Sequence, residues 1–212
     1  MTASERDNPV HTRTIRLFSV GAHTLTGIGD ARGLGWLGRV LAKTHVPDLR
    51  IESYPLVFPN ETTEQLAERW EREVLPRLAQ DHTENRMLIA VPQDPVDMAG
   101  SSARARLHLA NTLDRAAQHN IATFVVGPTP AQDAETNRHL AQLNSAYQDV
   151  AVRRDVPYID ALTDLVNHQN FNEDVMINDG LPGQAAYGLI AWLVLNRGWF
   201  EWLGVADPNI NH

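Results

Sequence analysis

A histidine lies near the start of the chain, in a glycine-rich loop that follows a short apolar run. The loop reads VGAHTLTGIGD, and its imidazole belongs to His23. Imidazole is the side chain best suited to accept and return a proton near neutral pH, so His23 is a candidate general acid–base group. The loop also carries the hydroxyls of Thr24 and Thr26, but it contains no serine.

Other common reactive groups are missing from the sequence. The chain has no cysteine, which excludes disulfides and thiolate metal ligands. It contains neither the histidine spacings typical of zinc enzymes nor the phosphate-binding pattern G-x-x-x-x-G-K-[ST]. We therefore expect neither a metal nor another cofactor.

Net charge and hydropathy restrict the kinds of molecule that the protein is expected to bind. The net charge of −8 argues against a nucleic-acid surface and against binding to anionic membranes. The polar N-terminal residues lack the apolar stretch of a signal peptide, and no segment approaches the roughly 20 apolar residues of a membrane span. We expect a cytoplasmic protein with a small-molecule ligand.

Trp192, Trp199 and Trp202 follow helical spacing near the end of the chain. This spacing indicates core packing or self-association, and self-association would make the protein a homo-oligomer.

Apolar runs rich in β-branched residues alternate with segments of helical period, a pattern typical of a parallel sheet in an α/β fold. We predict a single domain over residues 13–206, with a disordered tail at 1–12 and a C-terminal tail at 207–212. The expected strands are 15–20, 50–56, 86–92, 122–127 and 157–159, and the expected helices are 35–43, 62–78, 103–119, 134–154 and 184–195.

These elements predict a three-layer α/β/α sandwich around a five-stranded parallel sheet. In such folds the ligand site lies beyond the carboxyl ends of the strands, where the strand order reverses. Four loops then meet at the predicted site, and they comprise residues 21–30, 58–63, 92–100 and 127–133.

Two segments resemble conserved blocks of the SGNH, or GDSL-like, hydrolases. VGAHTLTGIGD resembles the family's first block, G-D-S-[LT]-x-x-G-x-G-D, and NDGLPGQAAYGLIAWLV resembles its last block. Between them, YPLVFPNETT and MLIAVPQDPVD stand where the family has its second and third blocks. The resemblance spans nearly the whole chain and implies the flavodoxin-like SGNH-hydrolase fold.

The same resemblance implies that the usual catalytic residues are substituted. Ala22 and His23 stand in the places of the family's aspartate and nucleophilic serine. Asn60 stands in the place of a glycine whose backbone N–H stabilises the oxyanion, and Gln93 or Asp94 replaces the asparagine that donates to the same oxyanion.

In the last block, Leu181 stands in the place of the catalytic histidine. The preceding aspartate corresponds to Asn178 or, with a one-residue deletion, to Asp179. Gly21, Thr24, Asp179 and Leu181 are therefore expected to border the substrate. Serine attack on an ester needs a base within hydrogen-bond reach, so the loss of both serine and histidine should abolish the usual mechanism.

Three hypotheses for the function follow. In the first, the pocket acts on a small organic substrate by elimination, isomerisation or cyclisation, with His23 as acid and base. Asn60 and Gln93 would polarise the substrate, and Asp94 or Asp179 would orient the imidazole. In the second, the protein is a pseudoenzyme or binding protein. In the third, it is an esterase with an atypical nucleophile such as Thr24.

Overall fold

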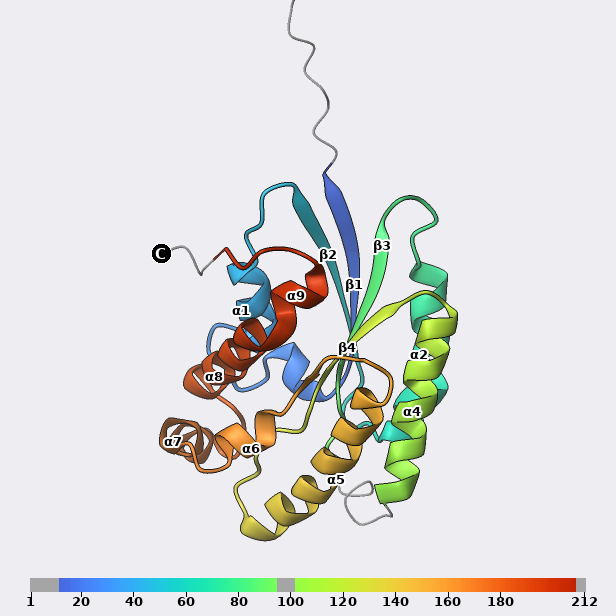
Figure 1. Ribbon diagram of the computed structural model, residues 1–212. Coiled ribbons are helices and arrows are strands. Elements are labelled where there is room, and N and C mark those ends of the chain that lie inside the picture. Colours follow the sequence, from blue (N-terminus) through green and yellow to red (C-terminus); the bar gives the residue numbers. More distant parts are fainter. Residues whose placement is uncertain (1–11, 95–101, 209–212) are drawn as a thin grey trace, which may run out of the picture.

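Five parallel strands form one sheet at the centre of the protein. The structure is a computed structural model, and it describes residues 12–94 and 102–208. The strand order is β2-β1-β3-β4-β5, which confirms the predicted five-stranded parallel sheet (Figure 1). The strands are β1 (Arg13–Gly21), β2 (Leu49–Val57), β3 (Glu84–Ala90), β4 (Ala122–Val126) and β5 (Tyr158–Ile159).

Helices cover both faces of the sheet, and two apolar clusters fill the spaces between the layers (Figure 1). One face carries α1 (Gly35–Lys43), α6 (Ala161–Leu165), α7 (Gln169–Ile177), α8 (Gln184–Val194) and α9 (Phe200–Leu203). The other carries α2 (Thr63–Val74), α4 (Ser102–Gln118) and α5 (Ala134–Val152). The predicted three-layer sandwich is confirmed.

Strand β1 illustrates why the sheet is buried on both sides. Successive side chains of a strand point to opposite faces. Ile15 and Leu17 belong to the cluster under α1 and α8, whereas Phe18 and Val20 belong to the cluster under α2 and α4. All four side chains are fully buried, as expected for a central parallel strand with helices on both faces.

The predicted long elements agree with the structure to within four residues at each end, and two of the deviations have local causes. The predicted helix 62–78 ends as an α-helix at Val74, and Leu75–Arg77 continues it as a 3₁₀ turn that contains Pro76. Proline lacks the N–H that an α-helix needs in its interior. The predicted strand 86–92 ends at Ala90, before Pro92.

Several short elements were not predicted. They are the 3₁₀ helix η1 (His23–Thr26), the helices α6, α7 and α9, and the π-helical turn η3 (Leu195–Trp199). Of the three tryptophans with helical spacing near the end of the chain, Trp199 is fully buried whereas Trp192 is 58% exposed. Core packing is thus confirmed for Trp199, and self-association stays a prediction.

Some predictions fall on residues that the structure leaves undescribed. Residues 1–11 and 209–212, which make up most of the two predicted tails, lie outside the described residues, as do residues 95–100 of the predicted 92–100 loop. Among the described helices, none has the length and apolar character needed to span a bilayer.

Candidate functional site

The first loop of the site begins where β1 meets β3. Gly21 ends β1 with a φ of +105°, and a Cβ atom on it would lie 1.9 Å from the carbonyl oxygen of Ala90. The next residue continues this contact, because the Ala22 N–H donates to the same Ala90 oxygen at 2.9 Å. Only glycine allows so close an approach of two backbones. The contact fixes the point at which the chain turns into η1.

His23 is the first residue of η1, and its side chain is half-buried. Burial lowers the pKa of its imidazole from the ordinary value of 6.5, because the charged form loses solvation. The ring is therefore neutral at pH 7 and has a nitrogen lone pair with which to accept a proton. A neutral imidazole is the form required of a general base.

His23 lines a small cavity beyond the carboxyl ends of β1, β2 and β3. Among the described residues the cavity encloses about 60 Å³. It has room for a few water molecules, since one water needs about 10–15 Å³. Its lining residues are Ala22, His23, Asn60, Glu61, Pro92, Gln93 and Asp94. The four predicted catalytic residues, His23, Asn60, Gln93 and Asp94, are thus brought to one place.

Asn60 contributes to the cavity from the loop between β2 and α2. Its φ is +51°, in the left-handed region that glycine and asparagine adopt most readily. A left-handed residue is consistent with the expectation, from the resemblance noted in the sequence, that Asn60 stands in the place of a glycine. The residue is exposed, so its amide group is accessible to a ligand.

Gln93 is held in place by Thr129, which lies in the loop after β4. The Gln93 Nε2 donates to the Thr129 carbonyl oxygen at 2.7 Å, and the Thr129 hydroxyl donates to the Gln93 Oε1 at 3.0 Å. An amide nitrogen carries two hydrogens. One N–H of Gln93 is therefore used by Thr129, and the second is the group that can donate to a substrate.

The threonines of the loop lie outside the cavity lining. Thr24 is 5% exposed, and the Thr26 hydroxyl donates to the His23 carbonyl oxygen at 2.7 Å. His168, a possible base for such a nucleophile, lines a different cavity together with Leu165 and Trp192. This geometry gives a threonine nucleophile no support.

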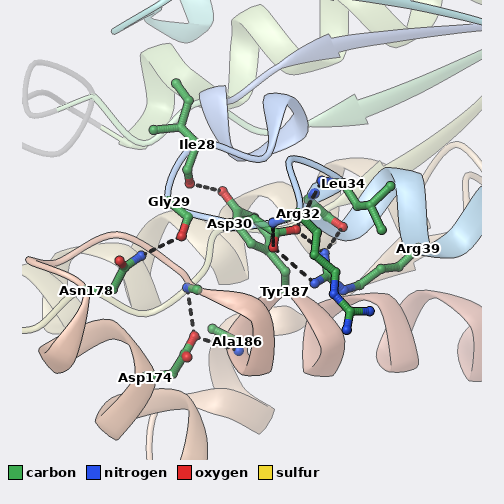
Figure 2. A network of polar contacts seen from close by, with 12 residues as sticks. Ile28, Gly29, Asp30, Arg32, Leu34, Arg39, Asp174, Asn178, Ala186 and Tyr187 are labelled. Atoms are coloured by element: carbon green, nitrogen blue, oxygen red, sulfur yellow. Dashed lines mark hydrogen bonds and ion pairs between the residues drawn. The ribbon is translucent and has the colours of Figure 1, made fainter.

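The loop between α7 and α8 contacts the far end of the first loop. Asn178 Nδ2 donates to the carbonyl oxygen of Gly29 at 2.9 Å (Figure 2). It also donates to the carbonyl oxygen of Leu181 at 3.1 Å. Asp179 is exposed, Leu181 is half-buried, and neither lines the His23 cavity in the described part of the chain. Their role in binding substrate stays a prediction.

Asp30 closes the first loop and fixes the start of α1. Its carboxylate accepts hydrogen bonds from the backbone N–H groups of Arg32, Leu34 and Gly35 at 3.0–3.1 Å (Figure 2). The Arg39 guanidinium forms an ion pair with the same carboxylate, whose side chain is fully buried. Arg39 and the backbone donors hold the pKa of Asp30 well below its ordinary value.

Helix α8 adds a further hydrogen bond to this network. Tyr187 donates its hydroxyl to the Ile28 carbonyl oxygen at 2.8 Å, which connects the helix to the first loop (Figure 2). Asp174 of α7 accepts from the N–H groups of Gly183 and Ala186 at the start of α8. These contacts connect the first loop to α8 and α8 to α7. The residues that make them do not line the described His23 cavity.

The family follows from sequence comparison. Residues 19–189 match the GDSL-like lipase/acylhydrolase family. The chain belongs to this family. No curated protein matches the sequence at a significant level.

Solved structures of two esterases and a lipase/acylhydrolase share the fold at low sequence identity. A psychrotrophic esterase from Pseudoalteromonas sp. matches with a TM-score of 0.69 and 15% identity, covering 89% of this chain and 98% of the esterase. A lipase/acylhydrolase from Enterococcus faecalis matches with a TM-score of 0.60 and 17% identity, covering 88% and 95%. An acetyl-xylooligosaccharide esterase from Geobacillus matches with a TM-score of 0.71 and 15% identity, covering 92% and 99%.

One residue that lines the cavity was not predicted from the sequence. Glu61 is 3% exposed, lines the cavity and pairs with Arg69 of α2. Its only local signal is its place directly before Thr62, whose hydroxyl caps α2. In the part of the chain that the structure describes, no group of three or more acidic or histidine side chains could hold a metal ion.

Proposed function

We propose that this GDSL-like protein catalyses proton transfer on a small organic substrate, with His23 as the acid–base group. One observation carries the proposal: a half-buried imidazole of lowered pKa lines the same cavity as Asn60, Gln93 and Asp94. A neutral imidazole can accept a proton from carbon next to a carbonyl and return it to another atom of the substrate. Elimination, isomerisation and cyclisation all use this step.

The neighbouring residues have complementary roles in the proposal. Asn60 and the second N–H of Gln93 donate to the oxygen that becomes negative as the proton leaves. Asp94 lies at the same cavity and orients the imidazole tautomer. The substrate is small, because the described cavity encloses about 60 Å³.

A second candidate function is binding without catalysis. The small cavity favours it, since about 60 Å³ leaves little room for a substrate, whereas pockets for drug-sized ligands have about 300 Å³ or more. The protein would then use the loops of the former ester site to hold a ligand or partner. Proton transfer to substrate distinguishes the two functions.

The proposal predicts that His23→Gln abolishes hydrogen exchange between substrate and solvent. Wild-type protein in D₂O is incubated with a panel of small ketones, aldehydes and esters, and NMR measures deuterium incorporation next to the carbonyl. Glutamine has similar size but no basic nitrogen, so the exchange rate should fall by about 10²–10⁴-fold.

The matched control is His119→Gln, which changes an exposed histidine just beyond the end of α4. Its exchange rate should equal that of the wild type. Wild-type exchange should also decline as the pH falls through the lowered pKa of His23, because the imidazolium cannot accept a proton. Equal exchange by wild type and His23→Gln on every compound would contradict the proposal.

A further prediction concerns ester hydrolysis. p-Nitrophenyl acetate should be hydrolysed no faster by this protein than by an inert protein at the same concentration, because serine and its base are both replaced. His23→Ser alone should not create activity, since a hydroxyl without a base stays protonated. Saturable turnover that Thr24→Ala removes would instead identify an esterase with a threonine nucleophile.

A further inference from the structure

The proposed mechanism leaves one buried charged pair beside the cavity without a role. Glu61 and Arg69 form an ion pair in which the two side chains are 1% and 14% exposed. Arg69 Nη2 lies 2.8 Å from Glu61 Oε2, and Arg69 Nε contacts Oε1, so the contact is bidentate. Both carboxylate oxygens of Glu61 thus bind the guanidinium, which makes the residue a poor proton donor or acceptor for a substrate.

Stability alone does not explain this pair. Removing two charges from water is costly, and replacing a buried ion pair by apolar side chains of similar volume is often neutral or stabilising. The burial cost is visible at Glu61, whose pKa is raised by desolvation despite the neighbouring guanidinium. What the pair provides, and an apolar pair cannot, is fixed geometry.

The contacts of Arg69 lie at the two ends of the segment that carries Asn60. Arg69 Nη2 donates to the Leu56 carbonyl oxygen at 2.9 Å as well as to Glu61. Leu56 lies in β2, before residues 57–60, and Glu61 lies directly after them. One guanidinium therefore joins both ends of a four-residue segment, made of the last residue of β2 and three loop residues, whose final residue has a left-handed backbone. Thr62 and Gln65 form a capping box that fixes the chain beyond Glu61.

We propose that Glu61 and Arg69 are positioning residues of the site, which hold residues 57–60 so that Asn60 faces the His23 cavity. This inference rests on the proposed function for its catalytic part, whereas the ordering of the loop is independent of it. A donor displaced by about 1 Å can cost about 10²-fold in rate, so a loop this short needs such a restraint.

The test compares two double variants. Glu61→Leu/Arg69→Met replaces the pair by apolar side chains, and Glu71→Leu/Arg115→Met removes an ion pair between α2 and α4 whose side chains are 22% and 58% exposed. Backbone ¹⁵N relaxation at Phe58 and Asn60 measures the order of the loop. In the first variant the order parameter should fall from about 0.85 to below about 0.6, and in the second it should not change.

Deuterium exchange into a substrate supplies the second measurement. The first double variant should lose about tenfold or more in kcat while its Tm stays close to that of the wild type. A flexible loop with an unchanged exchange rate overturns the positioning role, and an unchanged order parameter overturns the inference altogether. Absence of exchange in the wild type refutes the proposed function, while the order parameters still decide whether the pair holds the loop.

Arg69→Lys keeps the inference testable if the double variant does not fold. Lysine preserves the charge, but its single ammonium cannot contact both carboxylate oxygens and the Leu56 carbonyl in the planar arrangement of a guanidinium. The order parameter of Asn60 should therefore fall in this variant too. An order parameter equal to that of the wild type would show that charge alone suffices and would overturn the geometric role.

Discussion

Gly21→Ala should lower the free energy of unfolding by about 3 kcal/mol or more, through backbone strain and overpacking together. The added methyl would lie 1.9 Å from the Ala90 carbonyl oxygen, and the backbone at position 21 has a φ of +105°. Since the obstructing atom belongs to the neighbouring strand, no side-chain rotation relieves the overlap. Strands β1 and β3 would have to separate, which would also displace His23. Urea denaturation measures the loss.

Gly33→Ala is the matched control for this substitution. Gly33 also has a positive φ, of +64°, but a Cβ atom there would meet nothing within 4 Å. The control should therefore lose only the cost of a left-handed alanine, about 1–2 kcal/mol. Equal losses in the two variants would show that the close approach of β1 and β3 does not constrain the site.

Asp30→Ala should lower the free energy of unfolding by about 3–5 kcal/mol. The substitution leaves the Arg39 guanidinium without its carboxylate partner and removes the acceptor for the N–H groups of Leu34 and Gly35. The control Asp114→Ala removes a carboxylate that is 51% exposed and paired with Arg154, and it should cost less than about 1 kcal/mol. Comparable losses in both variants would contradict a structural role for the Asp30 network.

The pH dependence of this effect has a defined sign. The pKa of Asp30 is lowered in the folded state, so its ionisation stabilises the fold above the ordinary value of 3.8. That contribution should diminish as the pH falls below 3.8, because the unfolded state then binds a proton that the folded-state carboxylate, with its lowered pKa, does not. The stability difference between wild type and Asp30→Asn should therefore be largest near neutral pH and shrink in acid.

The long elements could be predicted because their signals are local. The start of helix α2 illustrates this, since Thr62 and Gln65 form a capping box there, whereas its end was predicted too late, beyond Pro76. The short helix α7 has weaker signals, with only Phe171 and Val175 buried along it. Short helices are marginal on their own and depend on tertiary packing, so their sequences carry less information.

The candidate site could be predicted only where it follows strand ends. His23, Asn60, Gln93 and Asp94 come directly after or close to three strands, and they line one cavity. Glu61 was missed because its partner Arg69 lies two turns along α2, and their contact depends on the path of the loop between them. Resemblance to the family also could not show that Asn178 connects its loop to Gly29 by a hydrogen bond.

The pKa of His23 is the most direct test of the claim that a neutral imidazole has replaced the serine of a GDSL-like site. NMR follows the ring proton signals of the nine histidines against pH, and the signal missing from His23→Gln identifies the residue. The account predicts a midpoint below 6.5, because burial penalises the charged ring. A midpoint above 6.5 would mean a stabilised imidazolium, and it would contradict the assignment of His23 as a neutral base.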